Sequence, residues 1–193
     1  VLEAWRQAPD RIDAIVPMLG PYEYTFNTAL PWGLGKGLYQ VFKRIGPGQA
    51  SVSLDVLSTL SRSSVIYALL KLSGMVGGSV PYDDMEPFFQ HLGDVDGPTL
   101  VQLAIAAQNH SAGDLLEDIA APTLIVSGGR DSLAPPRLGR EMEQRIPDSE
   151  LLIVEDATHT GILGHNQLIE DRVERFLEAH GLLAALERAA SSG

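Results

Sequence analysis

Residues 121–135 read APTLIVSGGRDSLAP, and this stretch decides the fold. Its run of β-strand formers at 123–126, apolar from Leu124 to Val126, lies between a proline and a pair of glycines, which is typical of a buried β-strand. The glycines predict a turn at the end of that strand, and Asp131 follows directly. An aspartate is therefore expected at the carboxyl end of a buried strand.

The segments after this stretch alternate between helix and strand patterns. A helix is predicted at 135–145, a second apolar strand at 150–154 and a last helix at 167–180. This alternation predicts parallel strands joined by crossover helices, and so an α/β fold. We expect the last helix to bury one stripe, formed by Leu168, Val173, Phe176 and Leu177.

The residues before 121 divide into a short core-like segment and a long helical one. Residues 1–8 have the helix pattern, and 12–19 form a short apolar run that predicts a third strand. Helical periodicity then appears at 38–45, 56–60, 65–72 and 100–107. At the other end of the chain, the tail at 189–193 is expected to fray. We therefore predict three parts: a core segment at 1–23, a helical cap insertion at 24–114 and a C-terminal core segment at 115–193.

Two residues with catalytic chemistry follow neighbouring strands of the predicted sheet. Asp131 follows the first strand of the C-terminal segment, and His159 follows the second. Because parallel strands end at the same edge of a sheet, the two side chains can meet there. A carboxylate would orient the imidazole and stabilise its charged form, and the imidazole would act as general base. Taken singly, Asp131 fits a turn residue and His159 a surface residue, so the pair carries the prediction.

Three other features give weaker signals. His159 and His165 have poor spacing for metal ligands and no obvious acidic third ligand. The glycine-rich segment 33–37 resembles a phosphate loop but lacks a preceding strand and a Ser or Thr after Lys36. Ser111 fits a helix start better than a nucleophile. We expect neither a metal nor a cofactor.

The nucleophile is the residue that the sequence does not supply. A nucleophile elbow needs small residues on both sides of its serine, because the turn crowds strand and helix together. No Gly-x-Ser-x-Gly motif occurs in the chain, so no serine here qualifies.

Residues 121–135, then 146–147, 156–159 and 171–177, resemble the C-terminal part of the α/β-hydrolase superfamily. Residues 2–12 are similar to the helix after the nucleophile elbow of that family, running into its sixth strand. The resemblance implies that Asp131 is the triad acid, that His159 is the base and that the helical stretch is the cap over the active site. Thr158 departs from the family, whose members often have glycine before the histidine.

The resemblance also implies that the nucleophile lies a few residues upstream of Val1. Independently, three strands that are apolar on both faces would leave one unpaired edge. We therefore expect a complementary N-terminal segment of the same fold, either a separate polypeptide or further sequence of the same protein.

The function implied by the resemblance is that of a serine-type hydrolase acting on an ester or thioester with an apolar acyl part. The apolar preference rests on large apolar residues of the predicted cap, which are candidates to line a pocket for a small hydrophobic substrate. They are Phe26, Trp32, Leu34, Leu38, Met75, Met85, Phe88 and Phe89. Two alternatives stay open, an aspartate nucleophile as in haloalkane dehalogenases and epoxide hydrolases, and a non-catalytic binding module. Some relatives place the acid after the sixth strand, where this chain offers Glu23.

Composition limits the partners. The net charge of −11 disfavours binding to nucleic acid or to anionic lipid. The absence of cysteine excludes disulfides, thiolate metal sites and a cysteine nucleophile. No apolar run approaches the roughly 20 residues of a membrane helix, and no signal peptide opens the sequence, so we expect a cytoplasmic protein.

Overall fold

The computed structural model describes residues 1–30, 33–44 and 64–184. Its sheet consists of β1 (Thr123–Gly128) and β2 (Ser149–Val154), which pair in parallel. Helix α7 (Pro136–Arg145) connects the two strands, and α9 (Asn166–Ala179) follows β2. These elements confirm the predicted α/β order and parallel pairing, with each boundary within a residue or two of the prediction.

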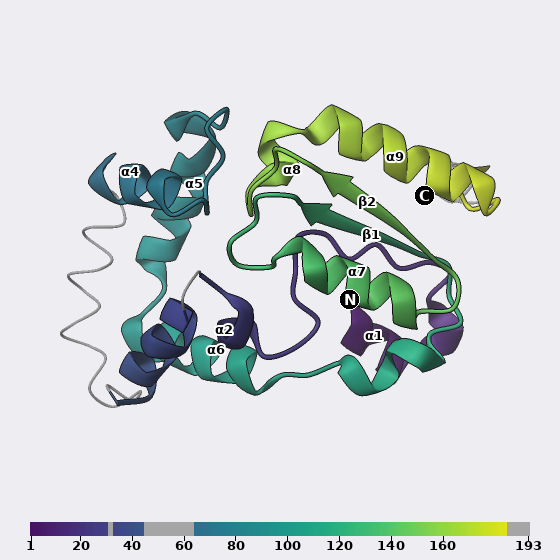
Figure 1. The fold of residues 1–193 in the computed structure, drawn as a ribbon, viewed down its shortest axis with the longest axis horizontal. Helices are drawn as coiled ribbons and strands as arrows, with labels where there is room; N and C mark the ends of the chain where they lie inside the picture. The colour runs from purple at the N-terminus through teal and green to yellow at the C-terminus, as the bar shows by residue number, and fades with distance from the viewer. Residues whose placement is uncertain (31–32, 45–63, 185–193) are drawn as a thin grey trace.

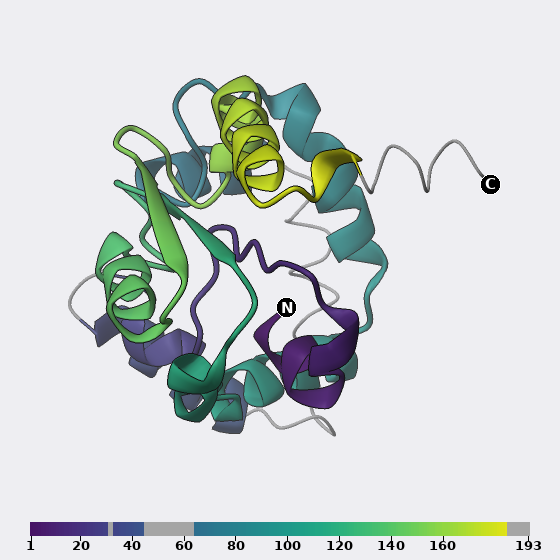
Figure 2. The ribbon, with the colours of Figure 1, turned by 90° about the vertical axis from the view of Figure 1, so that its right-hand side faces the viewer.

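Both faces of β1 are covered, which explains why its sequence is apolar throughout. Ile125 packs with Leu138 and Met142 of α7 in one cluster. Leu124 and Val126 pack with Phe176 of α9 in another. Alternate side chains of a strand point to opposite faces, so α7 and α9 cover opposite sides of the sheet (Figure 1, Figure 2).

The predicted strand at 12–19 runs along the other edge of β1, but it is not a continuous strand. Ile15 N donates to Pro122 O, Leu124 N donates to Ile15 O, and Val126 N donates to Pro17 O, each at 2.9 Å. The backbone nitrogen of Pro17 has no hydrogen to donate, so the parallel ladder breaks into two isolated bridges. The prediction was right about the position of this segment and wrong about its continuity as a strand.

The outer edge of this extended segment is open. Within the described residues, the backbone groups of Ala14 and Val16 have no hydrogen-bond partner, although their side chains pack against the core. Such an edge exposes a row of donors and acceptors that another strand can use.

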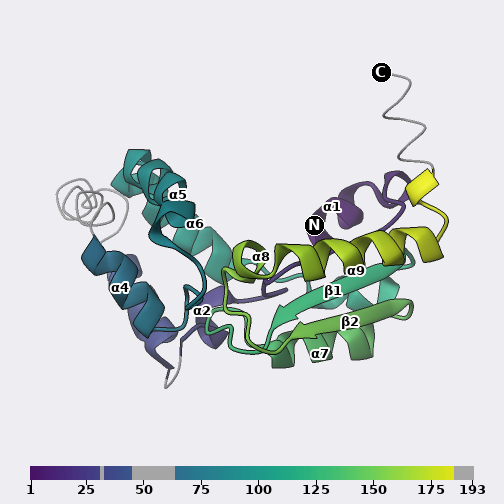
Figure 3. The same ribbon diagram turned by 90° about the horizontal axis from the view of Figure 1, so that it is seen from above.

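The remaining elements are helical. They are α1 (Leu2–Gln7), η1 (Pro9–Arg11), α2 (Thr25–Thr28), a helix at 34–44, α4 (Ser64–Leu72), α5 (Tyr82–Asp94), α6 (Gly97–Asn109), η3 (Gly113–Asp118) and α8 (Gly161–Gly164). The described residues between 24 and 114 contain no strand, apart from an isolated bridge between Ser111 and Glu23. Helices α2, α4, α5 and α6 lie beyond the ends toward which β1 and β2 point (Figure 1, Figure 3).

Some predictions fall outside the described part of the chain. These are the helix expected at 56–60, Trp32, the end of the helix expected at 38–45 and the tail at 189–193. The described helices contain none that is long and apolar enough to cross a membrane.

The buried stripe of α9 differs from the prediction at one position. Leu168 is 47% exposed, whereas the adjacent Ile169 is only 4% exposed and packs with Phe176 against β1. Residues 169, 173 and 176 are spaced by four and three, so they lie on one face of the helix. Leu168 lies to the side of that face.

The loops that leave β1 and β2 are joined by backbone hydrogen bonds. Gly129 N donates to Val154 O, and Arg130 N donates to Ala157 O, both at 2.9 Å. A Cβ at Gly129 would lie 2.4 Å from the carbonyl oxygen of Glu155, and a Cβ at Gly128 would lie 2.6 Å from that of Ala157. The two glycines therefore permit the close approach of the loops that carry Asp131 and His159.

We predict that Gly129→Ala destabilises the fold by about 1–3 kcal/mol, because the added methyl group meets backbone that has no room to move. Gly78→Ala is the control, since a Cβ there meets nothing within 4 Å. Denaturant unfolding measures both variants. Equal stability of the two would contradict the close approach.

A second prediction concerns α9. Ile169→Ala should cost about 2–4 kcal/mol of unfolding free energy, because it removes buried methyl groups and leaves a cavity. Leu168→Ala, the neighbouring change of similar size, should cost less than about 1 kcal/mol. The assignment of the buried face fails if the order of the two losses is reversed.

Candidate active site

Asp131 lies in the turn between β1 and α7, with its side chain fully buried. Its Oδ1 accepts hydrogen bonds from the backbone nitrogens of Leu133 at 2.8 Å and Ala134 at 2.9 Å. The aspartate thus holds the turn that leads into the helix, as the simpler interpretation predicts. Its second oxygen is left for another donor.

That donor is the imidazole of His159. Nδ1 of His159 lies 3.0 Å from Oδ2 of Asp131, which confirms the sequence-based expectation that the two side chains meet. An ionised carboxylate only accepts hydrogen bonds, so this contact assigns the proton to Nδ1 and leaves the lone pair on Nε2. Within the described residues Nε2 has no hydrogen-bond partner, and the side chain is 35% exposed. The pair can therefore accept a proton from a group that approaches Nε2.

The histidine loop is also held by the turn between α4 and α5. Gly77 N donates to Thr160 Oγ1 at 3.1 Å, and Thr160 Oγ1 lies 3.4 Å from Thr158 Oγ1. Sequence reasoning noted Thr158 only as a departure from a family pattern and missed Thr160. The nearest available signal was the cluster of glycines at 74, 77 and 78, of which Gly74 has φ +76°.

Glu23, the alternative acid, is not joined to His159 by any contact of the described residues. Its Oε2 accepts a hydrogen bond from Ser111 Oγ at 3.2 Å, in the short antiparallel bridge that these two residues form. Beside it, Tyr22 donates to Glu141 Oε2 at 2.9 Å, and burial together with this carboxylate raises the pKa of Tyr22. In the described structure Asp131, and not Glu23, is the partner of His159.

The weaker candidates gain no support. The described residues contain no group of three His, Asp or Glu side chains that could hold a metal ion, so His165 adds no such site to His159. Residues 34–37 of the glycine-rich segment begin the helix at 34–44, and a Cβ at Gly35 would lie 2.3 Å from Ala29 O and 2.6 Å from Phe26 O. This packing gives the glycine a structural role.

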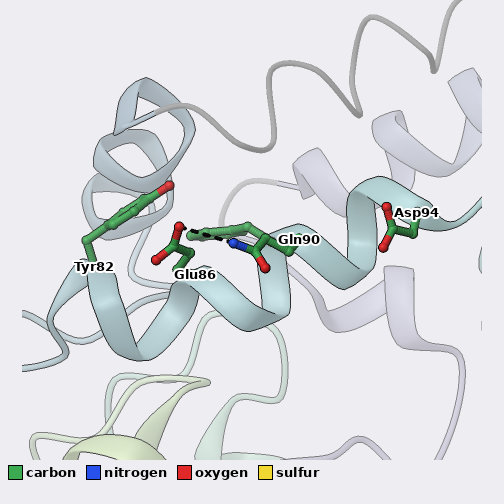
Figure 4. A pocket seen from close by; sticks show the side chains of 5 residues that line it. Tyr82, Glu86, Gln90 and Asp94 are labelled. Atoms are coloured by element: carbon green, nitrogen blue, oxygen red, sulfur yellow. Dashed lines mark hydrogen bonds between the residues drawn. The ribbon is translucent and has the colours of Figure 1, made fainter.

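The apolar candidates of the helical region do not form one pocket lining. Met85 and Phe89 are buried in a small core with Val76 and Val80, whereas Leu34 is 56% and Phe88 55% exposed. A surface pocket of about 320 Å³ does lie along α5, where Gln90 donates to Glu86 at 3.1 Å (Figure 4). Neither Asp131 nor His159 lines it, so it is separate from the candidate active site.

Comparisons with known proteins cover part of the chain. Residues 103–185 match the model of the TAP-like protein family, Abhydrolase_4. Over 82 residues the chain is 35% identical to a pimeloyl-[acyl-carrier protein] methyl ester esterase of Neisseria meningitidis, covering 42% of this chain and 26% of that protein. Over 63 residues it is 35% identical to proline iminopeptidase PfmaB of Pestalotiopsis fici, covering 33% and 22%. The chain thus spans about a third or less of these relatives.

Solved structures match nearly the whole chain. MGS-M2, an alpha/beta hydrolase enzyme from a deep-sea metagenome library, superposes with a TM-score of 0.59 at 18% identity, covering 92% of this chain and 60% of that one. A bromoperoxidase from Bacillus anthracis gives a TM-score of 0.62 at 18% identity, covering 87% and 59%. At this identity the likeness shows the fold. The family match over residues 103–185, the local sequence identity and the superpositions agree on the α/β-hydrolase fold for this chain.

Proposed function

We propose that this chain is part of a serine-type hydrolase that cleaves a carboxylic ester or thioester. His159 is its general base, Asp131 is the acid that orients the base, and the serine nucleophile comes from sequence outside the 193 residues. The observation that carries the proposal is the 3.0 Å contact between His159 Nδ1 and Asp131 Oδ2, with Nε2 left without a partner among the described residues.

The proposed reaction has two steps at this pair. Nε2 of His159 takes the proton of the serine hydroxyl while the serine oxygen attacks the substrate carbonyl carbon, and the imidazolium then gives that proton to the leaving alcohol or thiol. Water, deprotonated by the same Nε2, next attacks the acyl carbon, and the imidazolium returns that proton to the serine oxygen as the acid leaves. Asp131 stays ionised throughout and stabilises the imidazolium in each step.

The relatives support the class of bond. The Neisseria relative is named as a methyl ester esterase, and esterases are among the proteins with similar folds. An apolar acyl part is our inference from the helices of the region 24–114, which we propose act as a cap because they lie over the sheet ends where Asp131 and His159 emerge. Exposed apolar side chains such as Leu38, which is 41% exposed, are available there for contact with substrate.

The open edge at Ala14 and Val16 supports the complementary segment. We propose that a strand of that segment pairs with this edge and brings the serine toward Nε2. Nearby grooves support the same docking: one is lined by Met18, Ile162, Ile169 and Val173, and another by Val1, Leu2, Pro17 and Tyr22. Polar residues line these grooves as well, among them Asn166 and Glu170 in the first and Glu3 and His110 in the second, but the apolar residues beside the segment 12–19 would be covered by a larger sheet.

The first test uses the full-length protein with an activated short-chain ester. His159→Ala should lower kcat/KM by about 10²–10⁴-fold, because general-base catalysis is lost. Asp131→Asn should lower it by roughly 10³–10⁴-fold, because the amide no longer selects the Nδ1–H tautomer. His165→Ala and Glu23→Gln are matched controls that should change the rate by less than about threefold. Loss of activity in Glu23→Gln with retention in Asp131→Asn would overturn the assignment.

The nucleophile needs a separate test. A fluorophosphonate probe should label one serine outside residues 1–193, and labelling should weaken strongly in His159→Ala. An aspartate nucleophile predicts turnover of haloalkanes or epoxides without labelling. A binding module predicts neither labelling nor turnover.

The complementary segment is tested by comparing residues 1–193 alone with the same residues plus the N-terminal piece. The shorter chain should be inactive and poorly soluble, and the added segment should restore a compact fold and ester hydrolysis, because triad members act as a unit. A well-behaved monomer of residues 1–193 that hydrolyses the ester, at a rate unaffected by His159→Ala, would contradict this proposal.

A further inference from the structure

The histidine loop is anchored on two sides, and only one of them is Asp131. On the other side, Thr160 Oγ1 accepts a hydrogen bond from Gly77 N at 3.1 Å and lies 3.4 Å from Thr158 Oγ1. Thr158 is only 8% exposed, so its hydroxyl is held inside the protein. The residues immediately before and after His159 thus share one hydroxyl link.

The turn that carries Gly77 is itself firmly held by α4. The backbone nitrogens of Met75 and Val76 both donate to Leu70 O, at 3.0 and 3.1 Å. Lys71 Nζ donates to Gly78 O at 2.9 Å, and Tyr67 donates to Val80 O. The turn that touches the histidine loop is therefore joined to α4 by these four hydrogen bonds.

The turn also lies close to both segments that carry the candidate site residues. A Cβ at Gly164 would lie 3.0 Å from Ser79 Oγ, so the turn packs closely on the segment after His159. A Cβ at Gly74 would lie 3.9 Å from Ser132 Oγ, in the loop that carries Asp131. The turn between α4 and α5 thus lies against both loops of the candidate active site.

We propose that Thr160 is a positioning residue, whose hydroxyl ties the His159 loop to the turn between α4 and α5 and so fixes the direction of Nε2. This inference rests on the proposed function of His159. The contact with Asp131 fixes one ring nitrogen, but the ring can still tilt about that hydrogen bond if its backbone shifts. The link at Thr160 restrains that backbone, and small errors in the placement of reacting groups lower rates strongly.

The link depends on a hydroxyl, because Thr160 Oγ1 is the acceptor for Gly77 N. Thr160→Val keeps the shape of the side chain and removes the acceptor for Gly77 N. Thr160→Ser keeps the hydroxyl and removes only a methyl group. The two variants therefore separate hydrogen bonding from packing.

Three measurements on the full-length protein test the proposal. In Thr160→Val, amide exchange of Gly77 should accelerate and the ring resonances of His159 should move, while kcat falls roughly tenfold and KM stays within about twofold. In Thr160→Ser, the amide exchange of Gly77, the ring resonances of His159 and kcat should all be close to the wild-type values. If the valine variant does not fold, Thr160→Ala takes its place, because it also removes the hydroxyl, and the same changes are expected.

The control is Thr99→Val, which removes the hydrogen bond from Thr99 Oγ1 to Asp96 at the start of α6. It should lower stability without moving the His159 resonances. The proposal is overturned if Thr160→Val leaves Gly77 exchange and the His159 ring unchanged, or if Thr160→Ser behaves like Thr160→Val. If the wild-type protein hydrolyses no ester, the proposed function fails, whereas the exchange and ring measurements still decide whether Thr160 positions the loop.

Discussion

The parallel pairing of β1 with β2 ends with Gly128 beside Val154, and the geometry of the candidate site depends on that register. Because both strands end at the same level, the loops that follow them run side by side and exchange backbone hydrogen bonds. Glycine at 128 and 129 allows this approach, since any Cβ there would collide with carbonyl oxygens of the neighbouring loop. The contact between Asp131 and His159 is a consequence of this arrangement. Asp131 has two roles in this arrangement. Its Oδ1 accepts a backbone hydrogen bond within its own turn, and its Oδ2 accepts the hydrogen bond from the imidazole of His159.

The described structure is asymmetric around this pair. Nδ1 of His159 is fixed by a buried carboxylate, and the loop behind it is tied to the turn between α4 and α5 through Thr160. Nε2 has no partner among the described residues, and the extended segment at 12–19 has an open outer edge. Both features are accounted for by one proposal, in which a further strand pairs with that edge and carries a nucleophile. In the same proposal, the helices that lie beyond the sheet ends would form the cap over the ester.

Local pattern predicted β1, β2, α7 and α9 well, because a strand covered on both faces is apolar throughout and an amphipathic helix repeats every three to four residues. The same rule placed Asp131 and His159 at one edge of the sheet. It misjudged the segment at 12–19, where Pro17 removes one donor from an otherwise regular ladder. It also put Leu168 in place of Ile169 in the buried stripe, an error of one helical position. The contact of Gly77 with Thr160 joins residues far apart in the chain, and no periodicity signals such a contact.

The central claim is that Asp131 holds the imidazole of His159 with the proton on Nδ1 and the lone pair on Nε2. The most direct test is ¹⁵N NMR of the histidine ring in the full-length protein, at a pH where the ring is neutral. The account predicts a proton on Nδ1 with a downfield shift from the carboxylate, and loss of both features in Asp131→Asn. A neutral ring protonated on Nε2, or ring signals that Asp131→Asn leaves unchanged, would contradict it.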